Sequence, residues 1–267
     1  PFLSSMIEDC IGRGMSVQEG GAVYNFTGPQ GFGIANMADA LYAVKKLVFD
    51  EKKFTMAQLK DALDANYGHQ MTDEAAKQAT IEVVKAISES GKQVSPEQIA
   101  EIFKQIRSGE LNSARSAEYN EIREMINEVP KFGNDISEVD AFARDVAYTY
   151  TKPLETHKNP RGGMFQAGLY PVSANVPLGA QTGATPDGRL AGTPVADGVS
   201  PSAGKDIHGP TAAANSVSCL DHYIASNGTL FNMKFHPAAL EGKSGLESFV
   251  ALVRGYFDKK GSHMQFN

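Results

Sequence analysis

The stretch from Asn175 to Pro210 limits the folds that this chain can adopt. It reads NVPLGAQTGATPDGRLAGTPVADGVSPSAGKDIHGP, is dense in Gly and Pro, and has neither helical nor strand periodicity. A loop of this length inside a compact domain is usually either functional or disordered. The flanking segments, GGMFQAGLYPVSAN and SNGTLFNMKFHP, are apolar, aromatic and strand-like. We therefore expect a shaped loop between two buried strands, where binding residues concentrate.

The overall composition excludes several classes of protein. The net charge of −6 at pH 7 disfavours nucleic acid or an anionic membrane as a partner, because both need a concentrated basic surface. No apolar run is long enough to span a bilayer, and the start, PFLSSMIEDC, has no signal-peptide pattern. The only cysteines, Cys10 and Cys219, rule out a disulfide framework. We expect a cytoplasmic protein without a nucleic-acid or membrane partner.

Known ligand-binding motifs are absent. Among the six histidines, no two lie three or four residues apart on one helix with a carboxylate, so we expect no metal site. His222 and His236 flank a predicted strand and are expected to be buried, hydrogen-bonded residues. Gly28-Pro-Gln-Gly31-Phe-Gly33 lacks the small residue that a dinucleotide fingerprint needs at position 36, which is Asn. Asp187-Gly188-Arg189 is typical of a turn, held in place by Arg189.

The pattern of apolar residues predicts alternating helices and strands. Strands are expected at 164–169, 229–235 and 262–266, with helices opening at Asn36, Thr55, Ser95, Ser137 and Ser244, each of which can cap a helix. Strands separated by helices indicate a largely parallel α/β sheet, in which ligands gather at the carboxyl ends of strands. Residues 69–128 are polar and helical, and we expect them to form an insertion on the outside of the domain.

Several long blocks of this sequence, taken together, resemble the glycyl radical enzymes. The resemblance is to the branch with choline trimethylamine-lyase and the B12-independent glycerol and propanediol dehydratases, and it is weaker only in the helical insertion. The blocks are GGAVYNFTGPQGFGIANMAD, VPKFGND, NPRGGMFQAGLYPVSANVPLGAQTGATPDGRLAGTPVADGVSPS, GPTAAANSV, LDHYIASNGTLFNMKFHP and GYFDKKGSHMQFN.

The resemblance implies an α/β fold, the second half of a ten-stranded α/β barrel of the glycyl radical enzyme type, with residues 1–267 as a partial barrel domain. In the family, a Gly-Cys-x-Glu motif carries the radical cysteine, and a second loop with an Arg-Val-x-Gly-Tyr-like motif carries the radical glycine. Neither motif occurs here, so we expect the catalytic residues and the glycyl radical domain to lie outside this chain. By resemblance, Tyr170 and Val172 line the substrate pocket.

The resemblance also implies a function for the intact enzyme. ANVPLGAQTGATPDGR and the insertion after Tyr67 look most like choline trimethylamine-lyase, which would cleave choline to trimethylamine and acetaldehyde. The alternative is a B12-independent dehydratase of glycerol or 1,2-propanediol. No bound cofactor is expected beyond the glycyl radical, which a radical-SAM iron–sulfur activating enzyme installs. The intact protein is expected to be a homodimer from an anaerobic bacterium, in the cytoplasm or a bacterial microcompartment.

The ends of the chain suggest a fragment. Residues 262–267 look like a strand in mid-course, so we expect residues 1–267 alone to be inactive. We also expect half a barrel to leave inward-facing residues in water, namely Tyr170, Val172, Phe231 and Met233. A hypothesis of another class is a non-catalytic binding or assembly module. The unpaired edge of the last strand argues against this hypothesis.

Overall fold

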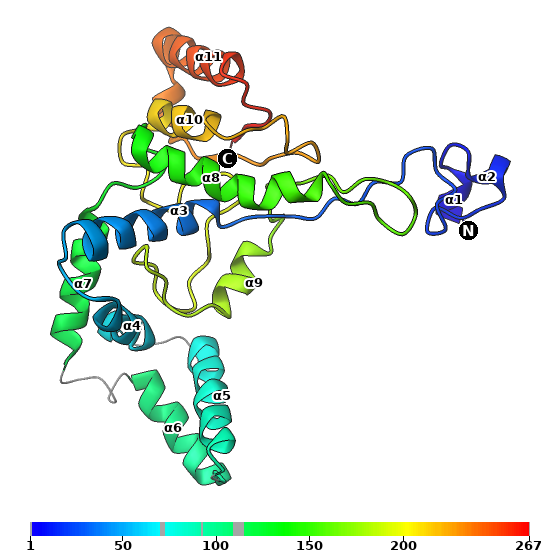
Figure 1. Cartoon of the computed structure of the whole chain (residues 1–267). Coiled ribbons are helices and arrows are strands. Elements are labelled where there is room, and N and C mark those ends of the chain that lie inside the picture. Colours follow the sequence, from blue (N-terminus) through cyan, green and yellow to red (C-terminus); the bar gives the residue numbers. More distant parts are fainter. Residues whose placement is uncertain (1, 70–72, 92, 109–114, 267) are drawn as a thin grey trace.

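The computed structural model describes residues 2–69, 73–91, 93–108 and 115–266, and helices make up most of it (Figure 1). Near the N-terminus, α1 and α2 form a small lobe. Helices α3 and α8 pack side by side in the body, with α10 and α11 close by (Figure 1). The helices are α1 (Phe2–Ser5), α2 (Cys10–Arg13), α3 (Ile34–Ala43), α4 (Met56–Asp64), α5 (Asp73–Glu89), α6 (Pro96–Ser108), α7 (Ser116–Glu128), α8 (Ser137–Leu154), α9 (Asn175–Ala180), α10 (Pro210–Ser218) and α11 (Gly242–Asp258). The π-helical turn η1 (Val44–Asp50) and the 3-10 turns η2 (Asn66–Gly68) and η4 (Pro237–Leu240) complete the helical elements.

Four extended segments form a parallel ladder. The strands β1 (Asn232–Met233) and β2 (Gln265–Phe266) are two residues long, and isolated bridges extend the pairing on the other side of β1. The parallel partners are Thr27 with Phe165, Gln30 with Gly168, Leu169 with Thr229, and Asn232 with Gln265. The strands predicted at 164–169, 229–235 and 262–266 therefore exist and run parallel, although their regular parts are shorter than expected.

The helices cover one face of this ladder. Phe231 is 1% exposed and Met233 is 7% exposed, and the ring of Phe231 lies 5.5 Å from that of Tyr256 in α11. The expectation that Phe231 and Met233 face water is therefore wrong. Successive side chains of a strand point to opposite faces, so 231 and 233 share the helix-covered face, while Leu230 and Asn232 are on the other and are only half-buried.

Local capping signals succeed in some places and fail in others. Thr55 and Gln58 form the predicted capping box at the start of α4, and Ser95 and Gln98 exchange the same two bonds before α6. Asn36 does not cap a helix, because α3 begins at Ile34 and the Asn36 side chain bonds distant segments instead. Helix α8 begins at Ser137 and α11 at Gly242, and neither has a side-chain cap, so the predicted caps at Ser137 and Ser244 are wrong.

The polar helical insertion is shorter than the range 69–128 that the sequence predicts. Helices α5 and α6 pack against each other, away from the body (Figure 1). Helix α7, which the expected insertion 69–128 would include, belongs instead to the core. Its residues Tyr119, Ile122 and Ile126 are each less than 5% exposed. Within the described ranges, no helix has the length and apolar character needed to cross a bilayer.

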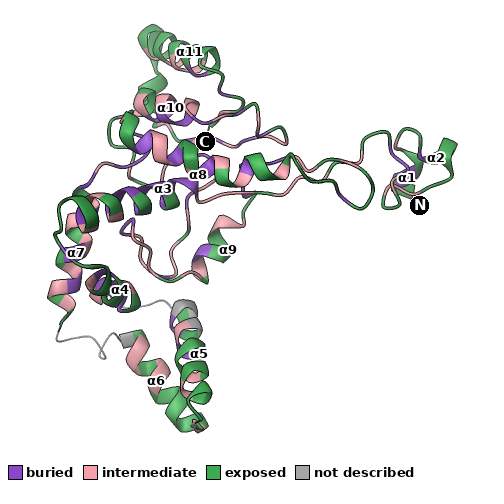
Figure 2. Ribbon diagram, viewed as in Figure 1, coloured by how far each residue is buried: buried purple, intermediate pink, exposed green. Residues whose placement is uncertain are grey.

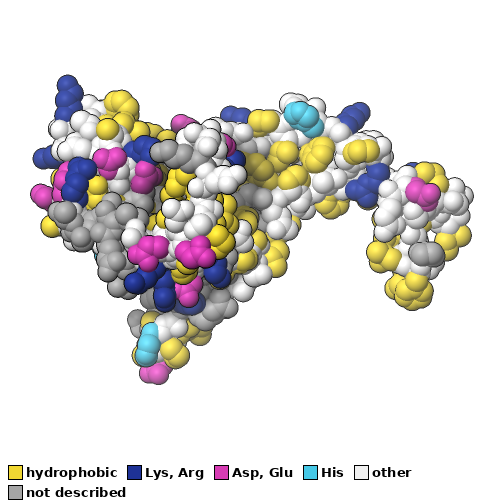
Figure 3. Space-filling model, turned by 90° about the horizontal axis from the view of Figure 1, so that it is seen from below, with side chains coloured by type: hydrophobic (Ala, Val, Ile, Leu, Met, Phe, Trp, Pro, Cys, Tyr) yellow, Lys and Arg dark blue, Asp and Glu magenta, His cyan; other side chains and the backbone are white. Residues whose placement is uncertain are grey.

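An arm joins the N-terminal lobe to the body. Asn159 donates to the carbonyl of Asn25, and Arg161 donates to the carbonyl of Phe26, so residues 155–164 run beside the N-terminal segment (Figure 1). The lobe and the arm are largely exposed (Figure 2), and apolar side chains lie on their surface (Figure 3). Exposed examples are Phe2, Leu3, Met6, Ile11, Val23, Tyr24 and Phe26.

Candidate functional site at the carboxyl edge of the ladder

The two residues that the resemblance placed in a substrate pocket follow directly on a ladder segment. Phe165–Leu169 leads into Tyr170-Pro171-Val172 at the carboxyl end. Tyr170 is half-buried. Val172 is 72% exposed and has a φ of 58°, in the left-handed region. Left-handed backbone at a β-branched residue costs on the order of 1–3 kcal/mol, and strain of this kind clusters at functional sites.

Sequence reasoning missed Asn227, which contacts Tyr170. Its Nδ2 donates a hydrogen bond to the phenol oxygen of Tyr170 at 2.9 Å, and its backbone N–H donates to the carbonyl of Ala167 at 3.0 Å. Tyr150 lies nearby, with its hydroxyl buried and unpartnered within the described structure. Burial raises the pKa of Tyr150, and Tyr170 adds to the shift. No periodicity singled out Asn227, because its role depends on the neighbouring strand.

The long loop is pinned to α3, as its anchored flanks led us to expect. The side chain of Asn36 donates to Asp187 at 2.6 Å and to Ser202 at 3.2 Å, and accepts from the backbone N–H of Ala196 at 2.6 Å. One carboxamide thus ties together three points of the loop.

Arg189 holds the turn that the sequence predicted around Asp187. The N–H of Gly188 donates to the carbonyl of Thr185 at 3.0 Å, which closes the turn. The guanidinium of Arg189 donates to Thr185 Oγ1 at 3.1 Å and to the carbonyl of Thr193 at 2.6 Å, and it also donates to the carbonyl of Gly183. The prediction of a structural turn pinned by Arg189 is confirmed.

A buried charge cluster lies beneath the loop. Asp39 in α3 accepts from the backbone N–H of Phe132, while its Oδ2 is buried and unpartnered within the described structure. Burial raises the pKa of the Asp39 carboxyl to about 7. Burial also lowers the pKa of the neighbouring Lys131 to about 8, although Lys131 donates to the carbonyl of Ile126 at 2.6 Å. Both groups are costly to ionise in this low-dielectric environment.

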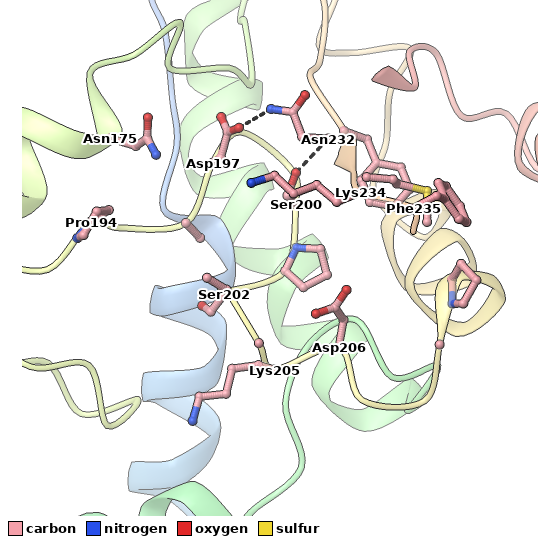
Figure 4. A pocket seen from close by; sticks show the side chains of 18 of the residues that line it. Asn175, Pro194, Asp197, Ser200, Ser202, Lys205, Asp206, Asn232, Lys234 and Phe235 are labelled. Atoms are coloured by element: carbon pink, nitrogen blue, oxygen red, sulfur yellow. Dashed lines mark hydrogen bonds between the residues drawn. The ribbon is translucent and has the colours of Figure 1, made fainter. Parts of the chain in front are cut away.

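A pocket of about 1090 Å³ opens between the loop, the end of β1 and α11 (Figure 4). Asn175 and Pro194 lie on one side of it, and Phe235 lies on the other (Figure 4). On its wall the side chain of Asn232 donates to Asp197, and the backbone N–H of Asn232 donates to Ser200 at 3.0 Å. Tyr170 and Val172 do not line this pocket. The two predicted site residues therefore form a separate surface from the pocket.

Two other buried or half-buried titratable groups, His222 and Cys219, make structural contacts. His222 is buried between the carbonyl of Val217, which Nε2 contacts at 2.9 Å, and Thr229 Oγ1, which Nδ1 contacts at 3.0 Å. Burial lowers its pKa, which favours the neutral ring, as expected for a buried histidine. His236, which was also expected to be buried, is exposed, so that expectation is wrong. Burial raises the pKa of the Cys219 thiol to about 12, which keeps it protonated. In the described ranges, no three His, Cys, Asp or Glu residues cluster as a metal site would require.

A parallel ladder with helices on one face and a pinned loop at its carboxyl edge defines an α/β protein of the barrel type. The family model "pyruvate formate lyase-like" matches residues 1–179, and the model "glycine radical" matches residues 195–267. The chain belongs to this family, the glycyl radical enzymes, as its sequence blocks suggested. Such enzymes act on small molecules and carry a glycyl radical that an activating enzyme installs.

Solved structures agree with this assignment. The chain matches a structure described as "1,2-propanediol Dehydration in Roseburia inulinivorans" with 64% identity and a TM-score of 0.93, over 100% of this chain and 32% of the other. It matches the B12-independent glycerol dehydratase from Clostridium butyricum with 49% identity and a TM-score of 0.74, over 100% and 28%. The partial α/β barrel of the glycyl radical enzyme type is thereby confirmed.

Curated relatives belong to the same family. Trans-4-hydroxy-L-proline dehydratase from Clostridioides difficile is 33% identical over all of this chain, which spans 28% of the relative's length. Other relatives include a decarboxylase and a sulfite-lyase. From the sequence we expected residues 1–267 to be barrel alone and the glycyl radical domain to lie outside this chain, whereas the glycine radical model matches residues 195–267. Those residues contain no Arg-Val-x-Gly-Tyr sequence.

Proposed function

We propose that this chain is part of a glycyl radical dehydratase that acts on a small vicinal diol, with 1,2-propanediol as the first candidate. The observation that carries the proposal is the 64% identity, with a TM-score of 0.93 over the whole chain, to the propanediol-dehydrating protein from Roseburia inulinivorans. The reaction converts 1,2-propanediol to propanal and water. In the intact enzyme, the glycyl radical would supply the radical chemistry that starts the reaction.

Choline cleavage was the leading expectation from the sequence, with the diol dehydratases as the alternative. That expectation depended on ANVPLGAQTGATPDGR and on the insertion after Tyr67. The match to the propanediol-dehydrating structure covers 100% of this chain, the insertion included. Because the insertion lies within this match, it does not separate a choline lyase from a diol dehydratase, and the 64% identity to the propanediol-dehydrating structure favours the diol.

In this proposal, Tyr170 and Val172 form part of the wall that faces the substrate. Both lie at the carboxyl end of a parallel strand, where ligands gather in α/β sheets. Val172 provides an apolar surface without an O–H, N–H or S–H group, and exclusion of water protects reactive intermediates. Tyr170 provides a hydroxyl for one polar contact with the diol.

The test is a substrate comparison with the intact enzyme after activation under anaerobic conditions. Separate assays with 1,2-propanediol, glycerol and choline would follow propanal, 3-hydroxypropanal and trimethylamine. We expect the kcat/KM for 1,2-propanediol to exceed that for choline by at least about a hundredfold, since a buried polar site discriminates strongly against a ligand that leaves its groups unpaired. Trimethylamine production without turnover of 1,2-propanediol or glycerol would overturn the proposal.

A further inference from the structure

Three segments that are distant in sequence meet at Tyr170. The strand 165–169 lies between the segment 27–30 on one side and Asn227–Thr229 on the other. The N–H of Gly168 donates to the carbonyl of Pro29 at 2.9 Å, and the N–H of Leu169 donates to the carbonyl of Gly228 at 2.8 Å. The strand that leads into Tyr170 is therefore held in register along both of its edges.

Two glycines leave the space that the Asn227 carboxamide and the Tyr170 ring occupy. A Cβ atom on Gly28 would lie 2.1 Å from Nδ2 of Asn227. A Cβ atom on Gly168 would lie 2.6 Å from Cε1 of Tyr170 and 3.0 Å from Nδ2 of Asn227. Neither glycine has a positive φ, so the requirement for glycine here is one of space rather than of backbone conformation. The absence of a side chain at Gly28 and Gly168 thus leaves the space that the Asn227 carboxamide fills.

The direction of the hydrogen bond between Asn227 and Tyr170 decides whether the phenol can still donate its proton to a ligand. A phenol has one proton to donate and lone pairs to accept with. Because Nδ2 of Asn227 donates to the phenol oxygen at 2.9 Å, the phenol proton is not used in this contact. Within the described part of the chain, the Tyr170 hydroxyl makes no other hydrogen bond. Its proton is thus free for a ligand at the carboxyl edge.

We propose that Asn227 is a positioning residue, which fixes the phenol of Tyr170 as a hydrogen-bond donor to a hydroxyl oxygen of the substrate. The inference rests on the proposed function, because it takes a vicinal diol as the substrate. Asn227 does not touch the diol itself. It acts by occupying the acceptor side of the phenol and by restricting rotation of the hydroxyl.

The main test uses the intact enzyme before activation, so that ligand binds without turnover. Fluorotyrosine at position 170 reports binding of 1,2-propanediol by fluorine NMR. In Asn227→Asp, the new carboxylate accepts the phenol proton and competes with the diol for it. We expect the Kd for the diol to rise about tenfold, as for the loss of one hydrogen bond. We also expect the fluorotyrosine pKa to rise, since a nearby carboxylate disfavours phenolate.

A double-mutant cycle separates positioning from a general structural effect. In a Tyr170→Phe background, Asn227→Asp should change the Kd for the diol by less than about twofold, because the hydroxyl that it controls is missing. In the activated enzyme, Asn227→Asp should raise KM about tenfold with little change in kcat. Equal losses in both backgrounds, or an unchanged Kd in Asn227→Asp, would overturn the inference.

A second variant protects the test against misfolding of Asn227→Asp. Gly28→Ala keeps the Asn227 carboxamide, but the added Cβ displaces it from its position beside Tyr170. We therefore expect a similar loss of diol affinity. Gly255→Ala in α11 is the matched control, because a Cβ there meets nothing within 4 Å. If the wild type binds choline and no diol, the proposed function fails. The fluorotyrosine pKa in Asn227→Asp would still test the hydrogen bond, and an unchanged or lower pKa would refute it.

Discussion

Oδ1 of Asp39 accepts a hydrogen bond of 2.7 Å from the backbone N–H of Phe132, across a sequence separation of 93 residues. The contact ties α3 to the segment between α7 and α8, beneath the long loop. Asp39 is 1% exposed and Lys131 is 5% exposed, so both charges are held in the interior. Such a cluster makes stability depend on pH.

Asp39→Asn should remove one part of this pH dependence. The pKa of Asp39 is raised by burial from 3.8 to about 7, so the folded state holds more protons and stability falls as pH rises through this range. The asparagine keeps an acceptor for Phe132. We therefore expect the unfolding temperature of the variant to rise relative to the wild type between pH 4 and 7. Asp64→Asn, an exposed partner of Lys60, is the control. A difference in unfolding temperature between variant and wild type that stays constant from pH 4 to 7 would contradict the prediction.

Lys131 makes stability depend on pH in the opposite direction to Asp39. Its pKa is lowered from 10.5 to about 8, mainly by burial, so the unfolded state binds more protons between these values and stability rises with pH there. Asp39 favours the charged form of Lys131, so in Asp39→Asn the rise should begin at a lower pH. Thermal melts of wild type and variant from pH 7 to 10 measure this shift. A rise that starts at the same pH in both proteins would argue against coupling of the two groups.

His222→Gln should make the protein less sensitive to acid. Burial lowers the pKa of His222, so the unfolded state binds more protons below about pH 6.5, where stability falls with decreasing pH. The variant should be less stable at pH 7 by about 1–3 kcal/mol, because buried hydrogen bonds are lost. Its unfolding temperature should then fall less than that of the wild type from pH 7 to 5. His157→Gln, at an exposed position, is the control.

Gly261→Ala should destabilise the contact between the end of α11 and β2. A Cβ at Gly261 would lie 2.2–2.5 Å from ring atoms of Tyr256, whose ring is buried and cannot move away freely. We expect a loss of about 1–3 kcal/mol, typical of overpacking. Gly255→Ala, in open space on the same helix, should be neutral or slightly stabilising. Equal unfolding temperatures for the two variants would contradict this reading of the contact.

Arg189→Lys should loosen the long loop without unfolding the body. Lysine keeps the charge but loses the fork that reaches Thr185, Thr193 and Gly183 together. Hydrogen exchange, measured on peptides from residues 182–195, should be at least about tenfold faster in the variant, as expected when about 1.5–3 kcal/mol of charged hydrogen bonding is lost. Arg13→Lys, in an exposed ion pair, is the control. Unchanged exchange would show that the other contacts of the loop, among them those of Asn36, hold it without the Arg189 guanidinium.

Residues 1–267 by themselves should show no turnover and no glycyl radical signal in electron paramagnetic resonance after incubation with the activating enzyme. The physical reason is that the chain contains neither Gly-Cys-x-Glu nor Arg-Val-x-Gly-Tyr, the motifs that carry the radical in the family it resembles. The intact enzyme, activated in parallel, is the positive control. A radical signal from residues 1–267 would mean that another glycine can carry it.

The sequence alone determined what depends on local patterns and on long blocks of similar residues. These are the family, the parallel order of the strands, the capping boxes at Thr55 and Ser95, and the turn at Asp187. A cap or a turn needs only residues a few positions apart, so the local sequence specifies it. The blocks identify the fold because they are long and occur in one order.

Only the tertiary structure decided how distant segments use their side chains. Asn36 looked like a cap but pins the loop, Phe231 and Met233 face helices rather than the open side, and α7 joins the core. The contact between Asn227 and Tyr170 depends on space left by Gly28 and Gly168 on two other segments. In each case the deciding partner lies far away in the sequence, so its distance and direction are set only when the strands and helices pack.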